Sequence, residues 1–249
     1  MPRYKLTVEY DGGPYVGWQR QDTGPTIQAA LEDVIQAFSG ERVTVEGAGR
    51  TDAGVHATGQ VAHVDLATDR FTAPKVMGAV NALLKPQPIA VRDAEIVSER
   101  FHARFSAVER AYRYVIMNRL APLAIGRGRA WHVSAPLDTN AMAMAGARLI
   151  GHHDFTTFRA SHCQSKSAIK TLDQLSVERD GERILVLARA RSFLHHQVRN
   201  IVGTLKLVGE GKWTPDDVTT ALEARDRSAG GPTAPAEGLY LTGVRYDAG

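Results

Sequence analysis

Asp52 is the residue of this sequence best suited to chemistry, because it lies in a short segment rich in glycine. Gly47, Gly49 and Gly54 permit backbone angles and close approaches that a Cβ would block, so the segment is neither a regular helix nor a regular strand. Arg50 and Asp52 are two residues apart and project to the same side of an extended chain. A carboxylate held in this way can act as a nucleophile, although an aspartate beside a glycine can also be an ordinary turn residue.

A second set of polar residues begins at His195. His195, Arg199 and Lys206 fall along one face of an expected helix over 195–209. The pair His195-His196 invites a zinc interpretation, but adjacent helical residues point about 100° apart and do not readily share a metal. The run 152–154 has the same weakness, so we expect no metal site.

Basic residues are unevenly distributed along the chain. The net charge is +3 and the isoelectric point is near 9.1, yet residues 100–129 hold seven arginines against one acid, Glu109. Aromatic residues alternate with these arginines, a combination suited to phosphate contacts and base stacking. A solvated charged face is the alternative interpretation.

The first half of the chain reads as strand, helix, two strands, helix and strand. Residues 4–10 alternate between apolar and polar, and Thr26 is the expected N-cap of a helix with apolar positions at helical spacing. Strands are expected over 42–47, 59–66 and 88–97, and a helix over 72–84. This order predicts a split βαβ, ferredoxin-like unit whose helices lie on one face of a mostly antiparallel sheet.

The second half repeats this design in element order, without a detectable sequence repeat. Strands are expected over 111–117, 168–179, 183–192 and 240–246, and helices over 138–150, 195–209 and 215–224. The fold class is therefore α+β with two ferredoxin-like halves. We expect an N-terminal subdomain over 1–105 that carries the Asp52 loop, and a C-terminal subdomain over 106–249 that completes the cleft.

The composition is that of a globular protein of enzyme size. Of the 249 residues, 43% are hydrophobic and 23% charged, and no apolar run approaches the roughly 18–20 residues of a membrane span. The single cysteine, Cys163, excludes an internal disulfide and a multi-cysteine metal site. We expect a cytoplasmic protein without a membrane partner.

Several motifs, in order along nearly the whole chain, resemble those of the TruA family of tRNA pseudouridine synthases. They are Glu9-Tyr10-Asp11-Gly12, Tyr15 through Gln21, Gly49 through His56, Phe101 through Ser106, Tyr112-Arg113-Tyr114, Asp154 through Ala160, Phe193 through Asn200 and Ala234 through Leu241. The resemblance implies the pseudouridine synthase fold. It also implies isomerisation of uridine at positions 38–40 in the anticodon arm of tRNA.

The resemblance carries individual roles onto matching residues. Asp52 matches the catalytic aspartate, and Arg199 matches the arginine paired with that aspartate. Tyr112 matches the tyrosine that stacks on the uracil and is considered as the base for the later proton step. Arg50 matches an arginine that holds the flipped-out base, and Leu239 an apolar wall of the pocket. A paired arginine favours the ionised carboxylate within a closed pocket.

The reaction implied by the resemblance breaks and remakes a glycosidic bond with no redox change and no group donor. We therefore expect no cofactor, in agreement with the absence of a cofactor motif. The resemblance also implies a homodimer that acts on tRNA. We therefore expect two partners, a second copy of this chain and tRNA. The basic residues expected to contact RNA are Arg20, Arg104, Arg110, Arg127, Arg129, His195 and His196.

Two other classes of protein remain open at this stage. A non-catalytic RNA-binding module would explain the basic segments but would not need Asp52 in a glycine-bounded turn, and the aromatic strand signature of the common RNA-recognition module is missing. A metal-dependent hydrolase would use the histidines with Asp65 or Asp154, whose spacing is poor.

Overall fold

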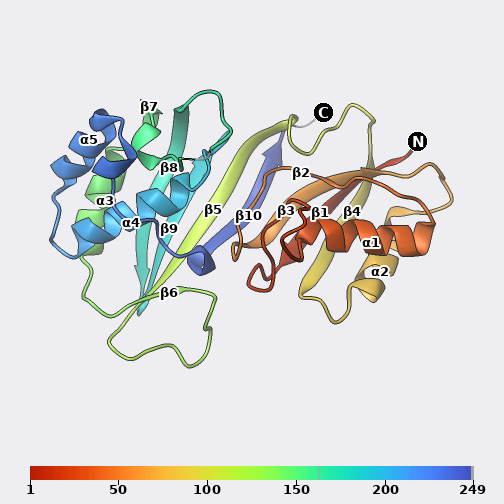
Figure 1. Ribbon diagram of the computed structural model, residues 1–249, viewed down its shortest axis with the longest axis horizontal. Coiled ribbons are helices and arrows are strands. Elements are labelled where there is room, and N and C mark those ends of the chain that lie inside the picture. The colour runs from red at the N-terminus through yellow and green to blue at the C-terminus, as the bar shows by residue number, and fades with distance from the viewer. Residues whose placement is uncertain (162, 248–249) are drawn as a thin grey trace. The chain divides into compact units, whose positions relative to one another are not determined.

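The computed structural model describes residues 1–161 and 163–247, so the last two residues of the second expected subdomain lie outside it. The chain forms two compact units. One contains Met1–Val108 together with the segment from Tyr240 onward, and the other contains Glu109–Leu239. Each unit is an α+β structure with a mostly antiparallel arrangement of strands and helices packed beside them (Figure 1). The expected fold class is confirmed.

The first unit is built on four strands in the order β4-β1-β3-β10, with the short β2 paired to β3. Its strands pair antiparallel except β10, which runs parallel to β3. The elements are β1 (Arg3–Tyr10), α1 (Ile27–Ser39), β2 (Glu46–Gly47), β3 (His56–Asp65), α2 (Ala73–Leu84), β4 (Ile89–Val97) and β10 (Leu239–Tyr246).

The sequence pattern of β1 and α1 explains how this unit packs. Alternate residues of β1 are buried, and α1 buries the apolar stripe that includes Ile27, Leu31 and Ile35. Thr26 caps α1 as expected, since its side chain accepts a hydrogen bond from the Ala29 N–H at 3.2 Å. Such a cap contributes about 1 kcal/mol to helix stability.

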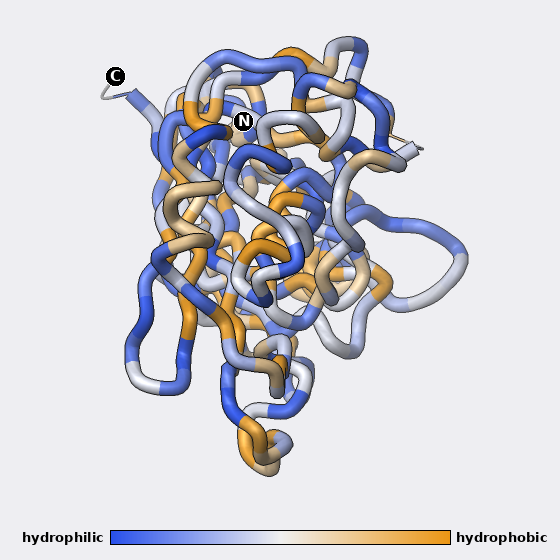
Figure 2. The backbone as a smooth tube through the Cα atoms, turned by 90° about the vertical axis from the view of Figure 1, so that its left-hand side faces the viewer, coloured by the Kyte–Doolittle hydropathy of each residue, from blue (hydrophilic) through white to orange (hydrophobic). Residues whose placement is uncertain are grey.

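The second unit is built on strands in the order β5-β9-β8-β7, with the short β6 paired to β5. Its helices α3 and α4 pack against each other, and α3 also lies on β8 and α5. Hydrophobic and hydrophilic stretches alternate along the backbone, as Figure 2 shows. The elements are β5 (Ala107–Asn118), β6 (Trp131–Val133), α3 (Thr139–Ala147), β7 (Gly151–Asp154), β8 (Ile169–Asp180), β9 (Arg183–Ala190), α4 (Gln197–Gly209) and α5 (Pro215–Ala224).

Three features differ from the expected elements. The strand expected over 42–47 is reduced to β2, because the Val45 N–H bonds to the Glu32 carboxylate at 3.0 Å instead of joining a ladder. The helix expected from His195 begins at Gln197, because His196 has a φ of 63° and cannot continue a right-handed helix. The final strand, expected in the second half, belongs from Tyr240 onward to the first unit, where Tyr240 lies opposite His56 of β3.

No helix among the residues that the structure describes combines the length and the apolar character needed to cross a membrane.

Candidate active site

Asp52 opens a tight turn in the connection between β2 and β3, residues 48–55, which we name the Asp52 loop. The Val55 N–H donates to the Asp52 carbonyl at 3.1 Å, and Gly54 adopts the left-handed φ of 77° that this turn requires. Backbone bonds from both flanks tie the loop to residues 15–18: Trp18 N–H donates to Thr51 O at 3.0 Å, and Gly54 N–H to Tyr15 O at 3.3 Å. The Asp52 side chain is therefore carried by a fixed backbone and is only partly buried.

Glycines outside the motif let residues 15–18 of the same chain lie close to the Asp52 loop. Gly17 has a φ of 113°, and a Cβ there would lie 2.7 Å from the Thr51 carbonyl oxygen. A Cβ on Gly47 would lie 2.6 Å from the Trp18 indole, whereas Gly49 faces open space. Of the glycines that drew attention to this segment, Gly47 and Gly54 are thus required by geometry, and Gly17 is a third that the motif did not indicate.

His56, the first residue of β3, supports the far end of the loop. It is 2% exposed, and its ring stacks on that of Tyr240 with centroids 4.7 Å apart. Its Nδ1 accepts a hydrogen bond from the Gly12 N–H at 3.0 Å. These contacts join three motifs of the first unit around one imidazole, and they give His56 a structural part that sequence reasoning did not assign. Arg50, on the same loop as Asp52, is exposed.

In the second unit, Tyr112 lies on β5 opposite Ala188 of β9 and is partly buried. Its ring meets Phe193 edge to face, with centroids 5.1 Å apart and planes at 87°. This contact fixes the direction of the ring, and pairs of this kind contribute about 0.5–1.5 kcal/mol beyond area burial.

Arg199 lies in the first turn of α4, where residues 230–235 lie along the helix. Its Nε donates to the Ala234 carbonyl at 2.8 Å, and the Ala234 N–H donates to the Arg199 carbonyl at 3.1 Å. Gly203, one turn further on, lets the segment touch the helix, since a Cβ there would overlap the Pro232 carbonyl oxygen. The guanidinium is thus oriented by a neighbouring backbone rather than by helix geometry alone.

Leu239 follows the same segment and is 6% exposed. The preceding Gly238 lies against the Tyr114 ring, where a Cβ would be 2.5 Å from the ring carbon that bears the hydroxyl. The Tyr114 hydroxyl donates to the Pro235 carbonyl at 2.7 Å, and burial raises the pKa of that hydroxyl. Tyr114 lies two residues beyond Tyr112 on the same face of β5, so these contacts hold the segment that leads to Leu239 against that strand.

The residues expected to contact RNA differ in how they are held. Arg104, Arg127, Arg129 and His195 are exposed, and His196 is partly buried. Arg20 instead donates to the carboxylates of Glu32 and Asp33 at 2.7 and 2.8 Å. Arg110 is 8% exposed and donates to the Arg191 carbonyl at 2.6 Å. Ion pairs engage the Arg20 guanidinium and burial covers Arg110, so we expect smaller contributions to phosphate binding from these two.

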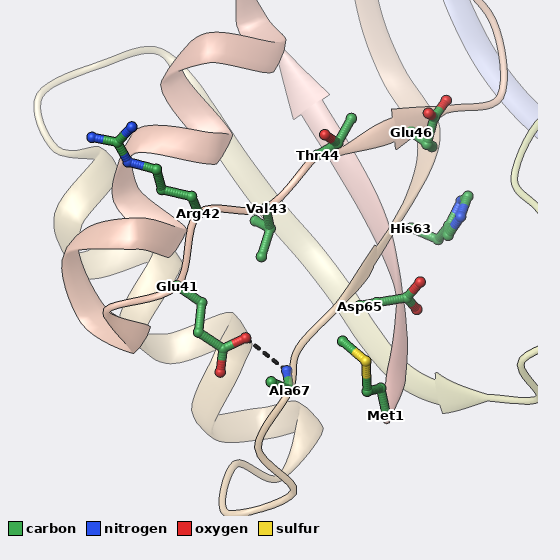
Figure 3. A pocket seen from close by; sticks show the side chains of 9 residues that line it. All are labelled: Met1, Glu41, Arg42, Val43, Thr44, Glu46, His63, Asp65 and Ala67. Carbon is green, nitrogen blue, oxygen red and sulfur yellow. Dashed lines mark hydrogen bonds between the residues drawn. The ribbon is translucent and has the colours of Figure 1, made fainter.

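A cavity of about 590 Å³ lies elsewhere in the first unit, between residues 41–46 and the end of β3 (Figure 3). Three carboxylates line it: Glu41, Glu46 and Asp65. Glu41 accepts a hydrogen bond from the Ala67 N–H at 2.6 Å, and Asp65 is paired with Arg3. Its acidic lining does not suit a polyanion, and it contains none of the residues expected in the site.

Comparison with known proteins defines the class to which this fold and these residues belong. The family model described as tRNA pseudouridine synthase matches residues 6–106 and 145–247, which include Asp52, Arg199 and Leu239 but not Tyr112. The chain belongs to the tRNA pseudouridine synthase family, and it is an isomerase. The resemblance found in the sequence is confirmed.

Individual relatives cover the whole chain. The tRNA pseudouridine synthase A of Paramagnetospirillum magneticum is 64% identical over 248 residues, which is 100% of this chain and 96% of the relative. The proteins of the same name from Rhodospirillum centenum and Rhodospirillum rubrum are 63% and 59% identical over 246 residues. Each of these alignments covers 99% of this chain, and they cover 100% and 88% of the two relatives.

Proposed function

We propose that this protein isomerises uridine to pseudouridine at positions 38–40 in the anticodon stem-loop of tRNA, with Asp52 as the nucleophile. The observation that carries the proposal is the position of Asp52 at the start of a turn that is anchored on both flanks. An enzyme that must attack one atom of a bound nucleoside needs such a fixed carboxylate. A simple RNA-binding module does not.

The proposed reaction leaves the composition of the nucleoside unchanged. The N1–C1′ bond breaks, the uracil turns, and a C5–C1′ bond forms; the proton on C5 is released and N1 gains one. Asp52 adds covalently, at C6 or at C1′, and leaves again at the end. The target base must first leave its stack, which costs a few kcal/mol and less near a loop than within a long helix.

The other residues then have distinct parts in this proposal. Tyr112 stacks on the uracil and offers its hydroxyl for the proton on C5, while Arg199 keeps the Asp52 carboxylate ionised. Arg50 holds the flipped-out nucleotide, and Leu239 forms an apolar wall. The fixed Tyr112 ring and the anchored Nε of Arg199 support these assignments.

The deciding experiment uses tRNA with tritium at uridine C5. The wild-type protein should release tritium to water without cleaving the RNA, which separates a synthase from a hydrolase and from a binding module. Asp52→Asn should abolish the release while tRNA affinity stays within a few-fold. Asp93→Asn, an exposed aspartate of β4 in the same unit, is the matched control and should be fully active. Pseudouridine formed by a clean Asp52→Asn preparation would refute the assignment.

We further propose that the protein acts on tRNA in the cytoplasm as a homodimer. The location and the dimer follow the resemblance alone, and the names of the relatives support only tRNA as the substrate. Analytical ultracentrifugation at the working concentration tests the dimer, and a monomer with full activity would refute it. Cell fractionation followed by immunoblotting tests the location, which membrane-bound protein would contradict.

A further inference from the structure

A buried layer of hydrogen bonds lies directly beneath the Asp52 loop. Tyr10, the last residue of β1, is 3% exposed, and its hydroxyl lies 2.8 Å from the Thr51 hydroxyl. Gln60 of β3 is 0% exposed and also interacts with the Tyr10 hydroxyl through its side chain. Its Nε2 donates to the Gly49 carbonyl at 2.7 Å.

These bonds fix the residues on either side of Arg50 and immediately before Asp52. The Thr51 hydroxyl is held by Tyr10, and the Thr51 carbonyl accepts from the Trp18 N–H at 3.0 Å. The Gly49 carbonyl is held by Gln60, whose Oε1 accepts from the Val61 N–H at 3.2 Å. The loop therefore has little freedom to rotate about its own backbone where the carboxylate is attached.

Because this layer is buried, breaking one of its hydrogen bonds costs more than breaking a hydrogen bond at the surface. A buried hydroxyl or amide that loses its partner has no water to replace it, so the three side chains constrain one another. Burial also raises the pKa of the Tyr10 hydroxyl further above neutral pH. The Tyr10 side chain is buried and its hydroxyl bonds to Thr51, so it acts on Asp52 through that neighbour.

We propose that Tyr10 and Gln60 are positioning residues, which act through Thr51 and Gly49 to hold the Asp52 carboxylate in line for attack. The inference rests on the proposed function of Asp52. A positioning role differs from a merely structural one because it affects the rate of the chemical step more than it affects binding or stability.

The test compares single-turnover rates, tRNA affinity and Tm among matched variants. Tyr10→Phe removes one oxygen, and Thr51→Val removes the hydroxyl at constant shape. Both should slow the chemical step roughly 10- to 100-fold with tRNA Kd unchanged. Thr51→Ser keeps the hydroxyl and should recover most of the rate. If Tyr10→Phe does not fold, the valine and serine variants of Thr51 still decide the matter.

Tyr4→Phe is the control, because Tyr4 lies on the same strand, is 0% exposed, and donates its hydroxyl to Phe71 O, outside the Asp52 loop. It should react at the wild-type rate. The double variant Tyr10→Phe/Thr51→Val should be no slower than the worse single variant, because both changes remove one interaction.

Two results would overturn the inference: a wild-type rate in Tyr10→Phe (or in Thr51→Val, where Tyr10→Phe does not fold), or an equal loss of rate in Tyr4→Phe. Asp52→Asn is measured alongside. Activity in that variant would refute the proposed function itself, whereas an inactive Asp52→Asn beside a fully active Tyr10→Phe would refute only the positioning role.

Discussion

Replacement of Gly203 by alanine should destabilise the protein, although alanine is the better helix former. Gly203 lies in the middle of α4, where alanine would ordinarily gain about 0.5–1 kcal/mol. Here the new Cβ would overlap the Pro232 carbonyl oxygen and would lie 3.2 Å from the Ala234 nitrogen. All of these atoms belong to backbone, so residues 230–235 must move away from the helix.

The loss of stability can be worked out from the hydrogen bonds that this movement breaks. Two join Arg199 to Ala234, and a third runs from the Gly231 N–H to the Thr204 hydroxyl at 2.9 Å. At about 0.5–1.5 kcal/mol each, their loss costs about 1.5–4.5 kcal/mol. After the gain in helix propensity, the net loss is about 2 kcal/mol, or roughly 4–8 °C in Tm for a chain of this size.

Gly78 provides the control, because it lies in α2 and a Cβ added there would have no neighbouring atom within 4 Å. Gly78→Ala should raise the free energy of unfolding by about 0.5–1 kcal/mol. Urea titrations of both variants measure the difference. A Gly203→Ala protein as stable as Gly78→Ala would refute the reasoning, as would an unchanged single-turnover rate in Gly203→Ala, since Arg199 would have lost its anchor.

Three other outcomes can be measured with the same materials. Tyr112→Phe should bind tRNA normally and stop after glycosidic cleavage, whereas Tyr112→Ala should also bind more weakly by about 1–3 kcal/mol; filter binding and tritium release distinguish the two, and full activity in Tyr112→Ala would remove this residue from the site. Neutral substitutions at Arg104, Arg127 and Arg129 should each reduce the slope of log affinity against log salt by about 0.7–0.9, and Arg20→Gln should change it least; equal slopes in all variants would contradict phosphate contacts. Activity should survive exhaustive chelation when a polyamine replaces magnesium in tRNA folding, and a loss reversed only by zinc would overturn that expectation.

Much of the fold could be predicted because local patterns determine it. The alternation in β1 and the cap at Thr26 gave the first strand and helix nearly to the residue. The short strands β6 and β7 were missed, since three or four residues are too few for a period to show. The partner of β10 was missed for another reason: alternation identifies a strand but does not say which strand lies beside it.

The site could be predicted only in part, because its supports are distant in sequence. The glycines around Asp52 predicted a loop at this point. Backbone hydrogen bonds on both sides of Asp52 hold that loop in place. Nothing local indicated that Gly17 would lie against Thr51, or that Tyr10 and Gln60 would meet beneath it. The pairing of β1 with β3 brings Tyr10 and Gln60 together, and loop contacts bring Gly17 to Thr51, both of which only the folded chain reveals.

The parallel pairing of β10 with β3 has a consequence for synthesis on the ribosome. The first unit cannot complete its sheet until Tyr246 has emerged, 138 residues beyond Val108. At about 5–20 residues per second, the nascent chain waits about 7–28 s with His56 and Ala57 of β3 unpaired on that edge, where β2 pairs only with Ala62 and His63. An open strand edge is a template for wrong pairing, so this end of β3 is exposed to that risk during the interval. Closure of the first sheet then follows the synthesis of the whole second unit rather than preceding it.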